Sequence, residues 1–139
     1  MDIQKIRIIS NNICYGPEPS PTDEVEQHLT ISANGRVWFT GYSYAGGFGK
    51  YKITRKNQFS IEKTIVDEIL NLFSKYCESE YILCYATDIG MWKIEITDAD
   101  NNEYIFKGSL CGGVSVDNID LSNYIRKNIL IKNLFVFGS

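Results

Sequence analysis

Histidine is almost absent from this chain of 139 residues, which contains only His28. One imidazole cannot assemble a common histidine-based metal site by itself. The presence of a single histidine also excludes the H-E-x-x-H zinc motif and nuclease mechanisms that need two histidines. The G-x-S-x-G elbow of many hydrolases is absent from the sequence as well. We therefore expect neither a metal nor another cofactor.

Long apolar runs and an excess of positive charge are also lacking. No apolar run approaches the roughly 20 residues that a membrane-spanning helix needs. The N-terminal MDIQKIRIIS is too short and too charged for a secretory signal. The formal net charge of −3 gives no whole-molecule attraction to nucleic acid or to an anionic membrane. These absences predict a cytoplasmic protein without a membrane partner.

The four cysteines form no C-x-x-C pair, and two of them lie in apolar runs. This pattern predicts reduced, buried thiols rather than disulfides.

What is present is enough for one folded domain over residues 1–139, since 44% of the residues are hydrophobic and 13% are aromatic. All three prolines fall in residues 10–23, which we interpret as a loop or arm because proline blocks strand pairing. Alternation and apolar runs predict strands at 3–9, 25–33, 36–44, 81–87, 91–97, 103–110 and 133–138. Residues 46–60 are expected to be irregular or a short strand.

Helical spacing predicts a long helix over about 60–77, with Ser60 as its N-cap, and a shorter helix near 120–130 capped by Asn118 or Asp120. Strands joined by short turns favour antiparallel pairing. We therefore expect an α+β fold, in which an antiparallel sheet of about six or seven strands carries both helices on one face.

Asn34-Gly35 is a strong hairpin signal. A two-residue loop at this position places Ile31 opposite Trp38 and puts both side chains in the core. The same register leaves Tyr42 and Tyr44 near the open end, with their hydroxyls in water. The remaining expected core residues are Trp92, Ile94, Ile96, Ile65, Ile69 and Phe73.

Residues 42–56 form the main candidate binding site, because aromatic and basic side chains interleave there and aspartate and glutamate are absent from 27–61. The candidates are Tyr42, Tyr44, Phe48, Lys50, Tyr51, Lys52, Arg55 and Lys56. Single-strand binders use rings to stack on bases and cations to meet phosphates. A protein-contact surface uses the same residues, and so does a plain solvated loop. The glycines here do not form a phosphate-binding loop, since Tyr51 follows Lys50 where Ser or Thr is required.

Two weaker candidates for chemistry remain. His28 lies two positions from Glu26 on the predicted hairpin, and Cys111 is the cysteine that such a base would activate in a small hydrolase or nuclease. The run DADNNE starts like a calcium loop, but Glu103 and Ser109 occupy the positions that need glycine and glutamate. We interpret it as a hairpin turn.

Three stretches, GRVWF, ATDIGMW and DLSNYIRKNILIKNLFVFG, resemble a group of short uncharacterised proteins of low-GC bacteria and their mobile elements. The resemblance covers most of residues 29–138. It implies a small accessory protein, of the kind that inhibits or adapts host systems such as CRISPR defence. It carries over no catalytic residue.

The leading expectation is a non-enzymatic protein that binds another protein. The alternatives are a nucleic-acid-binding protein that uses residues 42–56 and a small hydrolase or nuclease.

Overall fold

A computed structural model describes residues 2–13, 17–78, 90–110 and 114–137. The elements follow in the order β1 (Ile3–Asn11), β2 (Glu24–Ser32), β3 (Arg36–Ser43), β4 (Lys52–Ser60), α1 (Lys63–Glu78), β5 (Met91–Asp98), β6 (Glu103–Ser109), β7 (Ser115–Val116), β8 (Ile119–Asp120) and α2 (Leu121–Asn128).

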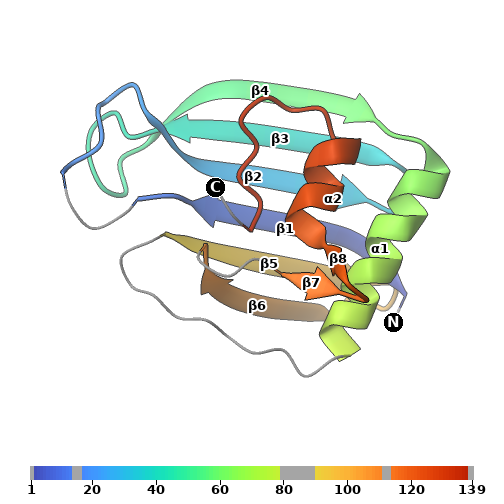
Figure 1. Cartoon of the computed structure of the whole chain (residues 1–139). Coiled ribbons are helices and arrows are strands. Elements are labelled where there is room, and N and C mark those ends of the chain that lie inside the picture. The colour runs from blue at the N-terminus through green and yellow to red at the C-terminus, as the bar shows by residue number, and fades with distance from the viewer. Residues whose placement is uncertain (1, 14–16, 79–89, 111–113, 138–139) are drawn as a thin grey trace.

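One six-stranded sheet organises the molecule, with the strand order β4-β3-β2-β1-β5-β6 and antiparallel pairing between all neighbours. Strands β7 and β8 form a separate small sheet. Both helices lie on the same face of the large sheet (Figure 1). The single-domain α+β prediction is confirmed. Within the described ranges, neither helix is long and apolar enough to cross a membrane.

The core lies between the helices and the sheet. Alternate side chains of the central strands are buried there, including Ile6, Ile8, Leu29, Ile31, Ile94 and Ile96. The expected burial of Trp92, Ile69 and Phe73 is confirmed. Ile65 is only partly buried and packs against the edge of the core.

Trp38 is not in the core, and that prediction was wrong. Ile31 pairs with Val37 rather than with Trp38, and Leu29 pairs with Phe39. Opposite residues share a face of the sheet, so Val37 and Phe39 are buried while 38% of Trp38 is exposed.

The loop of the hairpin explains this register. It has three residues, Ala33–Gly35, rather than two. The Gly35 amide donates to the Ser32 carbonyl at 2.9 Å, and Gly35 takes a φ of 90°. A turn closed by a residue of positive φ is the usual three-residue hairpin. The extra loop residue moves each β3 side chain to the other face.

Strand β4 is longer than expected and runs as an edge strand to Ser60, which pairs with Arg36. Ser60 therefore ends a strand instead of capping a helix, and α1 begins at Lys63. The predicted strand at 81–87 lies outside the described residues.

Local signals succeeded at the shorter helix and at the second hairpin. The Asp120 carboxylate accepts from the Asn123 amide and caps α2. Between β5 and β6, the Asp98 carboxylate accepts from the amides of Asp100 and Asn102 at 2.9 Å each. The run DADNNE thus closes a turn, as expected.

The C-terminal segment is not a strand, and this prediction was also wrong. Residues 133–137 cross the helix side of the sheet as turns and irregular backbone (Figure 1). Side chains, rather than a neighbouring strand, supply the hydrogen-bond partners of its backbone. The Gln27 amide donates to the Asn133 carbonyl and accepts from the Phe135 amide, and the Ser10 hydroxyl donates to the Val136 carbonyl at 2.6 Å.

The register predicts unequal costs for two neighbouring aromatics of β3. Phe39→Ala should lower the free energy of unfolding by about 3–5 kcal/mol, because it opens a cavity in the core. Trp38→Ala should cost only about 1 kcal/mol, as expected of a substitution outside the core. Urea denaturation of both variants measures the difference. Equal costs would mean that the tryptophan side of β3 is buried.

Candidate functional site: the open face of the sheet

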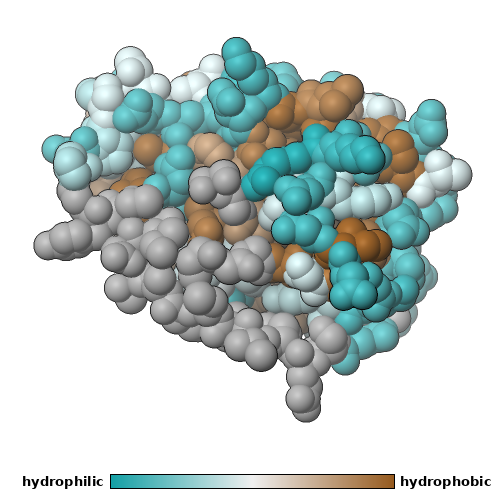
Figure 2. All heavy atoms as spheres, viewed as in Figure 1, coloured by the Kyte–Doolittle hydropathy of each residue, from teal (hydrophilic) through white to brown (hydrophobic). Residues whose placement is uncertain are grey.

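The face of the sheet turned away from the helices is not covered by either of them, and we call it the open face. On the helix side, hydrophilic side chains lie over α2 (Figure 2). The open face keeps four large hydrophobic side chains in contact with solvent, since Ile53 pairs with Tyr42 on this face. The exposed fractions are 38% for Trp38, 50% for Met91, 53% for Ile53 and 55% for Ile105. Single exposed hydrophobics are ordinary, but four on one face mark a candidate contact surface.

Strand register arranges the open face in rows across the sheet. One row runs from β4 to β6 through Lys56, Thr40, His28, Ile9, Lys93 and Lys107. We call it the cationic row. The neighbouring tryptophan row runs through Gln58, Trp38, Thr30, Arg7, Glu95 and Ile105.

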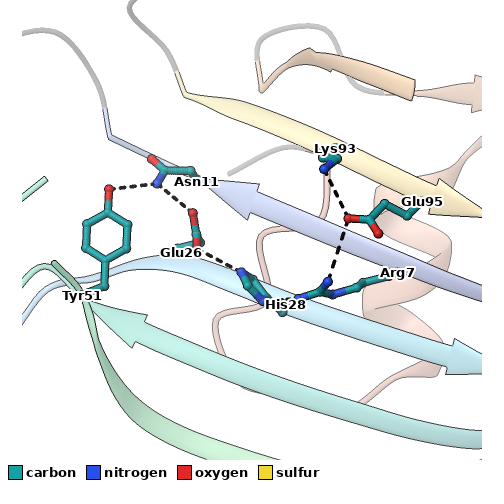
Figure 3. A network of polar contacts seen from close by, with 7 residues as sticks. All are labelled: Arg7, Asn11, Glu26, His28, Tyr51, Lys93 and Glu95. Atoms are coloured by element: carbon teal, nitrogen blue, oxygen red, sulfur yellow. Dashed lines mark hydrogen bonds and ion pairs between the residues drawn. The ribbon is translucent and has the colours of Figure 1, made fainter. Parts of the chain in front are cut away.

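A polar network ties the central strands together on this face (Figure 3). Arg7 Nη2 lies 3.0 Å from His28 Nδ1, and His28 Nε2 lies 2.9 Å from Glu26 Oε2. Asn11 bridges Glu26 and the Tyr51 hydroxyl, at 3.3 Å from each. The ring of Tyr42 packs against His28 with centroids 4.7 Å apart.

This geometry assigns the tautomer of His28. Arginine has no acceptor, so Nδ1 must accept from Arg7, and the ring proton on Nε2 is donated to Glu26. Both ring nitrogens are therefore engaged in structural hydrogen bonds. A general base needs a free nitrogen, so the geometry gives no support to catalysis by His28.

The hydrogen bond between His28 and Glu26 also affects the pKa of Glu26. The hydrogen bond from His28 is the main reason that the pKa of Glu26 lies below its ordinary value of 4.5. Burial opposes this shift, whereas the hydrogen bond from Asn11 adds to it. Glu26 is thus held as a carboxylate within the network.

The structure divides the candidate residues of segment 42–56 among different environments. Tyr44 is buried and donates its hydroxyl to Glu18 at 2.7 Å, so the expectation that it stays in water was wrong. Tyr42 and Tyr51 join the open-face network. Phe48 is 76% exposed in the loop before β4.

The four cations of that segment also separate. Lys56 pairs with Thr40 on the open face, whereas Lys52 pairs with Ser43 towards the helix side. Lys50 is exposed in the loop. The four basic groups therefore do not share one face of β4, because a bulge in the β3–β4 pairing places Lys52 and Lys56 on opposite faces.

Arg55 is used inside the protein. Its guanidinium donates to both oxygens of Glu24, at 2.9 and 2.7 Å, and lies over the ring of Phe39. Gly41 makes this contact feasible, because a Cβ there would collide with the Glu24 carboxylate. Burial raises the pKa of Glu24, but the hydrogen bonds from Arg55, Gln27 and Thr54 outweigh it and leave the pKa below 4.5.

The Glu24–Arg55 pair lines a groove of about 890 Å³ on the helix side, between the proline-rich segment and residues 132–135. The groove also contains Pro17, Pro19 and Lys132.

Of the cysteines, Cys77 lies within the described ranges, where burial raises the pKa of its thiol to about 11. It is therefore a protonated thiol at neutral pH and a poor nucleophile. Cys111 lies outside the described residues. In the part of the chain that the structure describes, no three His, Cys, Asp or Glu side chains group closely enough to hold a metal ion.

Several open-face residues were not singled out from the sequence, chiefly Arg7, Lys93, Glu95, Ile105 and Lys107. The available signal was the alternation of their strands. Trp92, Ile94 and Ile96 were assigned to the core, which leaves Lys93 and Glu95 on the opposite face.

Comparison with known proteins gives no family. No protein-family model matches the chain, and no curated protein matches it significantly.

Arg55 and Lys56 offer a matched test of the division within segment 42–56. Arg55→Met should lower the free energy of unfolding by about 1–3 kcal/mol, because the Glu24 carboxylate loses its charged donors. Lys56→Met should change it by no more than about 0.5 kcal/mol. Thermal and urea unfolding report both values. A neutral Arg55→Met would show that the ion pair contributes no stability.

The lowered pKa of Glu26 predicts that its contribution to stability depends on pH. Its pKa is lower in the folded than in the unfolded chain, so ionised Glu26 stabilises the fold above its ordinary pKa of 4.5, and this stabilisation is lost as the pH falls through the folded pKa. Glu26→Gln should be less stable than wild type at neutral pH, and the gap should close between about pH 5 and pH 3. Glu103→Gln, at an exposed position on the same face, is the control. A gap that widens on acidification would contradict the assignment.

Proposed function

We propose that this chain is a non-enzymatic binding protein that acts by contacting another protein through the open face of its sheet. The supporting observation is that Trp38, Met91 and Ile105 remain exposed on that face, while the opposite face packs under two helices. Tryptophan and methionine are enriched in protein interfaces. The polar network of Arg7, His28 and Glu26 gives the surface a fixed shape between them.

The setting we propose is a bacterium or one of its mobile elements, in which the chain inhibits a host system, for example CRISPR defence. The support for this setting is the resemblance of GRVWF, ATDIGMW and the C-terminal stretch to mobile-element proteins. The fold itself does not bear on it.

The two alternatives have less support. Nucleic-acid binding through residues 42–56 has less support because Arg55 is paired with Glu24 and Tyr44 is buried. Its exposed loop and edge groups are Phe48, Lys50, Lys52 and Lys56. A hydrolase would need His28 as a base, and both nitrogens of that ring are engaged.

Affinity capture in the bacterium that carries the gene, with quantification by mass spectrometry, tests the proposal. A double variant, Trp38→Ser with Ile105→Ser, should lose the protein that wild type captures. Leu130→Ser removes a side chain that is 87% exposed after α2, and it should retain the partner as the matched control. Phe48→Ser examines the loop before β4 in the same way.

If the open-face double variant retains the partner and Phe48→Ser loses it, the partner contacts the loop before β4 instead of the open face. If wild type captures no protein reproducibly, the proposal fails.

A further inference from the structure

The open face has a charge balance opposite to that of the whole chain. Its strand positions carry six basic residues, namely Lys5, Arg7, Arg36, Lys56, Lys93 and Lys107. The same positions carry three acidic residues, Glu26, Glu95 and Glu103, so the formal balance is +3, whereas the whole chain carries −3. The remainder of the molecule is accordingly acidic, and a positive surface is concentrated on one side.

Internal pairing uses two of the three acids. Glu26 accepts from His28 and Asn11. Glu95 lies 3.3 Å from the Lys93 ammonium and 3.9 Å from the Arg7 guanidinium. Other cations face neutral residues across the strands, such as Lys56 opposite Thr40 and Lys5 between Ser32 and Thr97.

Lys93 and Lys107 lie directly opposite each other on β5 and β6. Like charges in this position destabilise an antiparallel pair. The cost is removed when an anion lies between or over the two ammonium groups. Glu95 offsets part of this cost at Lys93, and the like-charge pair on a face that neither helix covers adds to the indication of an acidic ligand that the charge balance gives.

Hydrophobic side chains flank the lysine pair. Met91 precedes Lys93 by two residues on β5, Ile105 precedes Lys107 by two residues on β6, and all four point to the open face. Both hydrophobic side chains are at least half exposed. Carboxylates around an apolar centre complement such a surface.

These features favour a protein over a single-stranded nucleic acid. Stacking platforms present accessible rings in a row. Here the rings of His28 and Tyr42 are half-buried and pack against each other, which leaves Trp38 as the ring with the largest exposed fraction on the described strands. Exposed methionine and isoleucine have no role in contacting phosphates.

We infer that the partner meets the open face with an acidic protein surface, whose carboxylates lie over the cationic row and whose apolar groups contact Met91, Ile105 and Trp38. This inference rests on the proposed function and specifies its partner. The cationic row extends from β4 to β6, so it spans about 24 Å at the usual strand spacing. Carboxylates from more than one part of the partner are needed to cover it.

A synthetic peptide in which glutamates flank leucines is a suitable probe, with a glutamine-for-glutamate peptide and oligothymidylate as comparisons. Binding is followed by the NMR shifts of backbone amides at low and at physiological salt. The acidic peptide should shift β1, β5 and β6, and it should bind more tightly than both comparison probes. Its affinity should fall as salt is raised.

Charge reversal provides the matched variants. Lys93→Glu with Lys107→Glu should weaken the peptide about tenfold or more, because two attractive contacts become repulsive. Lys127→Glu with Lys132→Glu makes the same change in net charge at exposed positions in and after α2, and should leave the affinity within about twofold.

A single change separates binding from stability. Lys107→Glu replaces the like-charge pair with an opposite-charge pair, so the melting temperature should rise by about 2 °C. The same variant should bind the acidic peptide more weakly. A merely structural role for Lys107 would leave peptide affinity unchanged, and that result would overturn the inference.

Other outcomes also decide the question. Equal weakening by the two double variants would mean non-specific attraction, and tighter binding of oligothymidylate would assign the face to nucleic acid. If no probe binds, while the Trp38 and Ile105 double variant still loses its captured partner, the proposed function stands and the acidic partner does not.

Discussion

The length of the loop between β2 and β3 sets which side of β3 faces the helices. With Ala33–Gly35 as the loop, Val37 and Phe39 share a face with Ile31 and Leu29. The side chains between them, including Trp38, point the other way. Strand β4 pairs with β3, so its own two faces follow from the same choice. A loop shorter by one residue would bury Trp38 and would remove it from the row that it shares with Arg7 and Ile105.

The helix side is closed by polar contacts as well as by the hydrophobic core. Gln27 is 2% exposed, and its amide exchanges hydrogen bonds with the C-terminal segment. Arg126 donates to the carbonyls of Leu134 and Phe135, and Arg55 holds Glu24 beside the same segment. Buried polar groups satisfied in this way fix one arrangement, because an alternative would leave them unpaired in a low dielectric. Gln27, Arg126 and Arg55 thus form their hydrogen bonds within the protein, on the helix side of the sheet.

Features that depend on a few neighbouring residues could be predicted from the sequence. The α+β class, the β5–β6 hairpin and the Asp120 cap are of this kind. Features that depend on distant partners could not. Residues 133–137 have strong strand propensity, yet Gln27 and Ser10 supply hydrogen bonds to their backbone. The ion pair of Arg55 could not be predicted, because no acidic residue lies near it in the sequence. Strand pairing brings the Glu24 carboxylate to its guanidinium. The prediction of the hairpin register was wrong because Asn-Gly also fits a loop that is longer by one residue.

Trp38 lies on a positively charged face of the sheet that neither helix covers. Fluorescence quenching in a Trp92→Phe variant, where Trp38 is the remaining tryptophan, tests this placement most directly. An exposed ring in a positive potential should be quenched more efficiently by iodide than by caesium, because anions concentrate near the surface. The preference should shrink as sodium chloride screens the charges. Protection from both ions would mean that Trp38 is buried, and stronger quenching by caesium would mean that the face is not positive.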